Sequence, residues 1–71
     1  MDGQIVKYSE RLQQGVIRSA DGALFRFKSS SIRNLGGKLV GTEVDFLVES
    51  RQPRDIFLLQ GSPWMAFGLA R

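Results

Sequence analysis

The sequence predicts a single all-β domain in which five short strands close into a small antiparallel barrel. Runs of strand-forming residues alternate with turn signals at short intervals, which is typical of such barrels. The chain has 71 residues, enough for one domain and no more. It contains neither cysteine nor histidine, so packing and a closed hydrogen-bond network, rather than disulfides or a metal site, are expected to hold the fold.

The first three predicted strands form a meander over residues 3–8, 14–18 and 23–28. Asp21-Gly22 is the clearest turn signal between them, because glycine tolerates the positive φ of tight hairpins. Ile5 and Val6 are consecutive apolar residues, which simple alternation does not produce. The first strand is therefore expected to bend or bulge at this point.

The third predicted strand alternates aromatic and basic side chains. Phe25 and Phe27 share one face of this strand, and Arg26 and Lys28 share the other. We therefore expect both phenylalanines to point into the barrel and both cations to line an outer surface that is open to solvent.

A short helical turn is predicted after the third strand, at the serines of residues 29–31. A loop separates this turn from the fourth predicted strand, which covers residues 42–49. Alternation along the fourth strand places Val44, Phe46 and Val48 toward the core.

Residues 50–54, which include Pro53, are predicted to form the turn before the last strand. The fifth strand is expected to cover residues 55–60. Its alternation predicts two inward residues, Ile56 and Leu58, and two outward residues, Phe57 and Leu59.

The sequence divides into a barrel of residues 1–60 and an apolar tail of residues 61–71. One interpretation is that the tail folds back over outward apolar side chains or over an open end of the barrel, because a thin core gains most from such burial. The other is that the tail contacts a protein partner or a second copy in a homodimer, since exposed apolar patches mark interactions. The candidate contact residues are Phe57, Trp64 and Phe67.

The formal net charge of +3 is unevenly distributed along the chain. Residues 1–41 carry seven basic and three acidic side chains, and residues 42–71 carry three basic and four acidic ones. A one-sided basic surface favours an anionic partner such as nucleic acid. The alternative is that these cations are solvated and serve only solubility.

A longer pattern runs through the predicted strands. Residues 3–17 read G-Q-I-V-K-Y-S-E-R-L-Q-Q-G-V-I, and the Asp21-Gly22 turn, F-R-F-K at 25–28, S-S-I at 30–32 and G-T-E-V-D-F at 41–46 follow. In this order and spacing the chain resembles the bacterial cold-shock domain, whose opening pattern is G-x-V-K-W-F-N-x-x-K-G-F-G-F-I. The resemblance covers residues 3–58 and implies an OB-type barrel that binds single-stranded nucleic acid.

The departures from that family concern its exposed aromatic residues, on which bases stack. Lys7 stands where the tryptophan belongs, although Tyr8 keeps the adjacent aromatic. The other replaced aromatic or histidine positions of the two binding motifs are Gln14, Val16, Arg26 and Lys28. The resemblance thus implies a retained scaffold that has lost most of its stacking platform.

The expected function is weak, largely sequence-independent binding of single-stranded RNA or DNA through a basic face of the first three strands. The residues expected to bind are Lys7, Tyr8, Gln14, Val16, Arg18, Arg26, Lys28 and Arg33. The alternative is a protein-interaction or regulatory module that keeps the OB barrel and has lost nucleic-acid binding.

The sequence does not predict an enzyme, a metal site or a cofactor. The serines of residues 29–31 have no histidine to activate them, and Gly36-Gly37 lacks the Lys-Ser/Thr pair of a phosphate loop. No segment has the apolar length of a membrane span, and the amino terminus has no signal-peptide pattern, so a cytoplasmic location is expected.

Overall fold

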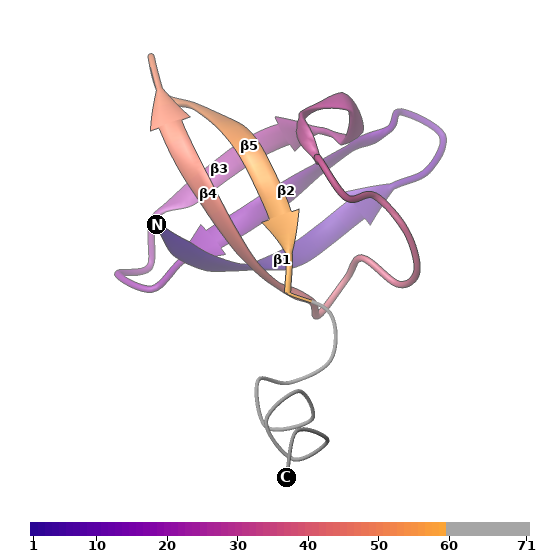
Figure 1. Cartoon of the computed structure of the whole chain (residues 1–71), viewed down its shortest axis with the longest axis horizontal. Coiled ribbons are helices and arrows are strands. Elements are labelled where there is room, and N and C mark those ends of the chain that lie inside the picture. The colour runs from indigo at the N-terminus through magenta and orange to yellow at the C-terminus, as the bar shows by residue number, and fades with distance from the viewer. Residues whose placement is uncertain (60–71) are drawn as a thin grey trace, which may run out of the picture.

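The computed structural model describes residues 1–59 (Figure 1). Its strands are β1 (Asp2–Ser9), β2 (Gln14–Ser19), β3 (Leu24–Lys28), β4 (Glu43–Glu49) and β5 (Gln52–Leu58), and a 3-10 turn, η1 (Ser29–Ser31), follows β3. The predicted all-β class, the five antiparallel strands and the short helical turn are confirmed. The predicted tail, with Trp64 and Phe67, lies outside the described residues.

The strands form one curled sheet in the order β3-β2-β1-β4-β5, with every neighbouring pair antiparallel. The curl brings β5 against β3, and in Figure 1 β4 and β5 cross in front of the other strands. No strand ladder joins β3 to β5 within residues 1–59, so the closed barrel expected from the sequence is not confirmed. The link between these two edges is an isolated parallel bridge from Ile32 to Ile56.

The segment after η1 covers part of the β5 edge. The backbone N–H of Arg33 donates to the carbonyl oxygen of Ile56 at 2.8 Å. The side-chain amide of Asn34 both donates to the carbonyl of Leu58 at 2.9 Å and accepts from its N–H at 2.7 Å. β3 ends at Lys28 and η1 follows, and within residues 1–59 the bridge from this part of the chain to β5 is formed by Ile32.

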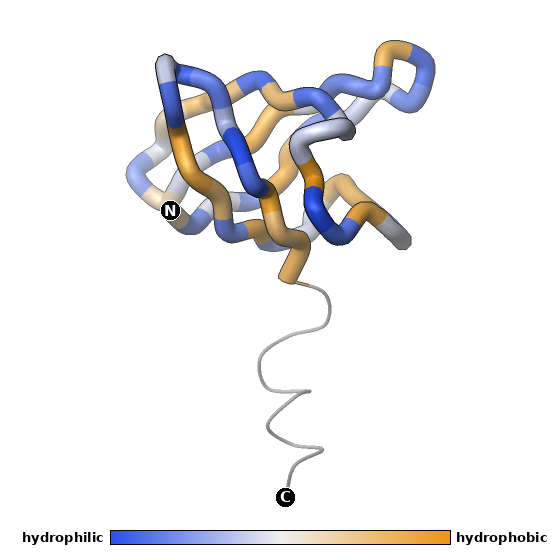
Figure 2. Tube along the Cα trace, turned by 45° about the horizontal axis from the view of Figure 1, so that its top comes forward, coloured by the Kyte–Doolittle hydropathy of each residue, from blue (hydrophilic) through white to orange (hydrophobic). Residues whose placement is uncertain are grey.

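The core lies between the two halves of the curled sheet. Its buried residues are Ile5, Ile17, Phe27, Ile32, Val44, Phe46, Ile56 and Leu58. Phe25 packs edge-on against Phe46, with the ring centroids 5.7 Å apart. The predicted inward residues are thus confirmed except Val48, which is 36% exposed because the β4–β5 hairpin extends beyond the core. Figure 2 shows the resulting alternation of apolar and polar residues along the strands.

The predicted irregularity in β1 is confirmed as a bulge. Ile5 pairs with Ile17 and Lys7 pairs with Val16, so Val6 is an extra residue in β1. The bulge keeps Ile5 in the core while Lys7 lies on the opposite side of the sheet, next to Val16.

The predicted turn over residues 50–54 is wrong. The turn consists of Ser50 and Arg51, which have φ values of 52° and 65°, and β5 already begins at Gln52. Pro53 is buried in β5 and pairs with Val48. Proline fits here because β5 is an edge strand, where a missing N–H need not break a ladder. The predicted fifth strand, residues 55–60, therefore begins too far along the chain, because the observed strand begins at Gln52.

The turn between β2 and β3 contains a hydrogen-bonded carboxylate, as the Asp21-Gly22 signal suggests. Ser19, which is 5% exposed, accepts from the N–H of Ala23 at 3.2 Å and donates its hydroxyl to Asp21. This donated bond, followed by the bond from the Ala23 N–H, lowers the pKa of Asp21. The ionised carboxylate is therefore the form that the fold prefers.

We expect Asp21→Asn to reduce the acid sensitivity of the fold. Because the pKa of Asp21 is lower in the folded state, its stabilisation is complete above about pH 4 and is lost as the pH falls through the folded pKa. Urea unfolding from about pH 7 to about pH 2.5 should show a shallower fall in the free energy of unfolding for the variant. Ser19→Ala should also make the free energy of unfolding fall less steeply over this pH range. A pH dependence of Asp21→Asn that runs parallel to that of wild type contradicts the stabilising role of the Asp21 carboxylate.

Candidate nucleic-acid interface

The sheet register aligns the outward residues of β1, β2 and β3 in three rows. These rows are Gln4–Arg18–Leu24, Lys7–Val16–Arg26 and Ser9–Gln14–Lys28, and together they are called the basic face here. Alternate residues of a strand point to one side of a sheet, so the three rows share the outer side. The cations of the basic face, Lys7, Arg18, Arg26 and Lys28, are all exposed.

The rows of the basic face contain no carboxylate, although Asp2 and Glu43 line a hollow with Arg18 at its edge. The cations of the basic face form no ion pair or side-chain hydrogen bond within residues 1–59. The nearest acidic side chain along the rows is Glu43 of β4, which pairs with Gln4. The positive potential of the basic face is therefore available to an anionic partner.

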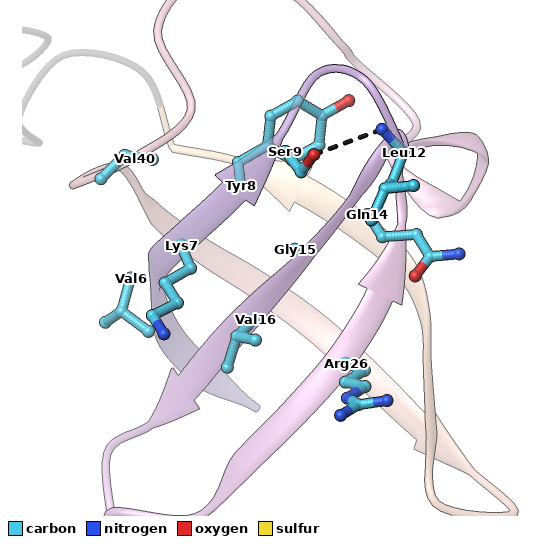
Figure 3. A pocket seen from close by; sticks show the side chains of 10 residues that line it. All are labelled: Val6, Lys7, Tyr8, Ser9, Leu12, Gln14, Gly15, Val16, Arg26 and Val40. Carbon is cyan, nitrogen blue, oxygen red and sulfur yellow. Dashed lines mark hydrogen bonds between the residues drawn. The ribbon is translucent and has the colours of Figure 1, made fainter.

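An open hollow of about 620 Å³ lies on the part of the basic face that contains Lys7, Val16 and Arg26 (Figure 3). Its lining residues are Val6, Lys7, Tyr8, Ser9, Leu12, Gln14, Gly15, Val16, Arg26 and Val40. Lys7, Val16 and Arg26 lie on adjacent strands in one row, so the floor is aliphatic and has a cation on each side. The hollow therefore offers apolar contact and positive charge together.

Five of the predicted binding residues line this hollow: Lys7, Tyr8, Gln14, Val16 and Arg26. The prediction missed Leu12 and Val40, which lie in two loops and are 64% and 42% exposed. The signal in the sequence was that both are apolar residues outside the predicted strands. Sequence alone did not show that the two loops meet at the same hollow. Val6 was also missed, although the predicted bulge already placed it close to Lys7.

Tyr8 reaches the hollow from the inward side of the sheet. It pairs with Gly15, which pairs with the buried Phe27, and the rings of Tyr8 and Phe27 stack with centroids 6.2 Å apart. Gly15 makes room for this contact, because a Cβ atom there would lie 2.7 Å from Phe27. Tyr8 is thus half-buried against the core and is not one of the outward row residues.

Three other predicted residues lie away from the hollow. Lys28 belongs to the basic face, in the row of Gln14, but does not line the hollow. Arg18 belongs to the basic face but lies in the row next to Glu43 and does not line the hollow. Arg33 follows η1, and its Nη1 atom lies 2.9 Å from a carboxylate oxygen of Asp55. The structure therefore places Arg33 with β5 and Phe57 instead of with the basic face.

Comparison with protein-family models, curated proteins and solved structures finds no match for this chain. The likeness to the cold-shock domain therefore stays a prediction from sequence. Within residues 1–59 there is no group of three or more acidic, cysteine or histidine side chains placed to hold a metal ion. No helix in the same part of the chain is long and apolar enough to cross a membrane.

Proposed function

We propose that the basic face binds single-stranded nucleic acid weakly and with little sequence preference. The observation that carries this proposal is the set of exposed cations on β1, β2 and β3, which form no ion pair within residues 1–59 and two of which, Lys7 and Arg26, line a largely apolar hollow. Grooves that bind single strands combine positive charge for the phosphates with contact surfaces for the bases. The proposal includes an OB-type arrangement like that of a cold-shock domain, which the strand order and the curl of the sheet support.

The chemistry of the basic face sets the expected strength of binding. Arg26 and Lys28 neutralise phosphates, and the guanidinium group of Arg26 also stacks on a base. Each aromatic stacking contact is worth about 1–3 kcal/mol, and the outer rows offer none. Charge therefore supplies most of the affinity, and RNA and DNA are expected to bind alike.

Binding without catalysis is part of this proposal, as is a cytoplasmic location. The chain has no histidine or cysteine to act as a base, nucleophile or soft metal ligand, which supports a binding role.

Reversing two charges on the basic face is expected to abolish binding. The test uses fluorescently labelled oligo-dT and oligo-U strands of about six nucleotides, titrated with protein between about 20 mM and about 200 mM salt. If two phosphates are neutralised, the wild-type affinity should fall about 25-fold over this tenfold rise in salt. Arg26→Glu with Lys28→Glu should leave no measurable binding at the lowest salt.

The matched control is Arg51→Glu with Arg54→Glu, on the β4–β5 hairpin. Each double variant lowers the formal net charge of +3 by four. A difference in affinity between the two variants therefore reports the position of the reversed charges and not the net charge of the protein. The control should keep most of the wild-type affinity for these short strands. Absence of wild-type binding at low salt refutes the proposal and favours the protein-interaction module.

A further inference from the structure

A second exposed surface lies on the outer side of the β4–β5 hairpin. Its apolar side chains are Leu47, Phe57 and Leu59, which are 60%, 47% and 44% exposed. A hollow of about 490 Å³ lies between Leu47 and Phe57. This surface, called the apolar hairpin face, is formed by strands other than those of the basic face.

Most charged groups around the apolar hairpin face are paired within the chain. Its three ion pairs join the Met1 amino group to Asp45 at 3.1 Å, Arg33 to Asp55 at 2.9 Å, and Arg54 to Glu49. They are the ion pairs found within residues 1–59, and none of them lies on the basic face. An apolar centre with a satisfied polar rim is the organisation of protein interfaces.

Two charged residues of this hairpin have no such partner among residues 1–59, and they lie at its opposite ends. Glu43 begins β4 beside Leu59, and Arg51 lies in the turn between β4 and β5. Both residues are exposed. A strand of seven residues separates them by about 20 Å or more.

We propose that a second copy of this chain docks on the apolar hairpin face, with a two-fold axis through its centre. A two-fold axis that lies in the plane of the interface and is perpendicular to the strands of the hairpin places the Glu43 end of one copy over the Arg51 end of the other, twice. The same operation places the two apolar centres against each other. The face is therefore complementary to itself in both charge and hydrophobicity, whereas the basic face repels its own copy.

The proposed dimer is weak and leaves both basic faces exposed. An apolar patch of this kind covers a few hundred Å², less than half of what a standard interface buries per partner. We therefore expect half-association at a chain concentration of about 10–1,000 µM. Two basic faces on one particle then hold a long single strand more tightly than one face does.

Sedimentation velocity of the full chain between about 10 µM and about 1 mM tests the proposal. Wild type should shift from monomer to dimer over this range. Leu47→Asp should stay monomeric, and Leu24→Asp, which changes a leucine of similar exposure (65%) on the basic face, should still dimerise. Thermal unfolding of both variants verifies that they are folded.

Exchanging the two charges tests whether a second copy docks on the apolar hairpin face in this orientation. Glu43→Arg alone and Arg51→Glu alone should each abolish self-association, because both place like charges together in the dimer. An equimolar mixture of these two single variants should recover it, since every cross-pair is then of opposite sign.

Each of the following results overturns the proposal by itself. They are a wild-type chain that stays monomeric at about 1 mM, a dimer that Leu47→Asp leaves intact, and a mixture without recovery. A monomer in which Leu47→Asp alters the fluorescence of Trp64, the single tryptophan, shows instead that the chain's own residues 60–71 occupy the face, and this also overturns the dimer. Binding of short oligonucleotides is measured separately, so either proposal can fail alone.

Discussion

Replacing Gly15 by alanine is expected to lower the free energy of unfolding by about 3 kcal/mol or more. A Cβ atom there would lie 2.5 Å from the carbonyl oxygen of Lys7 and 2.7 Å from two atoms of the Phe27 ring. The oxygen belongs to the paired strand β1, and Tyr8 stacks on the ring, so a shift of either neighbour would disturb a contact of the fold. A domain of this size has about 4–10 kcal/mol in total, so the loss is a large share of its stability.

Urea unfolding followed by circular dichroism measures this loss. Gly36→Ala is the matched control, because a Cβ atom at Gly36 meets no heavy atom within 4 Å. The control is expected to stay within about 0.5 kcal/mol of wild type. A folded Gly15→Ala variant with wild-type stability contradicts the packing of Tyr8, Gly15 and Phe27 described above.

Introducing an aromatic ring at Val16 is expected to raise affinity for single-stranded nucleic acid about tenfold. Val16 forms the floor of the hollow between Lys7 and Arg26, where a base held by these cations would lie. One base stacked on an aromatic side chain contributes about 1–3 kcal/mol, and about 1.4 kcal/mol corresponds to a tenfold change in affinity. Titration of Val16→Trp with the short labelled strands at low salt measures the gain.

Val48→Trp controls for a nonspecific effect of added aromatic surface. Val48 is a valine of partial exposure, 36%, on the β4–β5 hairpin and away from the basic face. This control should bind as wild type does. Equal affinities of Val16→Trp and wild type, with both proteins folded, mean that bases do not reach the hollow.

The sequence predicted most of the fold because short-range alternation determines which side chains are buried. Phe25 and Phe27 were predicted correctly from period two alone, and so were Ile56 and Leu58. The consecutive residues Ile5 and Val6 also revealed the bulge.

The errors concern features that depend on distant parts of the chain. Pro53 was assigned to a turn because nothing local indicates that its strand lies at the edge of the sheet. Closure of the barrel depends on whether β3 and β5 pair, and these strands are far apart in sequence and form no ladder within residues 1–59.

The candidate site was predictable on the strands but not in the loops. The positions of Lys7, Gln14, Val16 and Arg26 follow from strand register, and register follows from the buried pattern. Arg33 was assigned by its charge alone, although its position after η1 and its ion pair with Asp55 remove it from the basic face.

The side-chain amide of Asn34 donates one hydrogen bond to the backbone of Leu58 and accepts one from it. These are the two hydrogen bonds that the backbone of a neighbouring strand would otherwise form with Leu58. One residue outside any strand thereby occupies the end of an edge that could otherwise recruit a foreign strand. We therefore expect protection of this edge from edge-to-edge pairing to depend on a loop residue, so that changes at Asn34 would affect solubility more than the sheet itself.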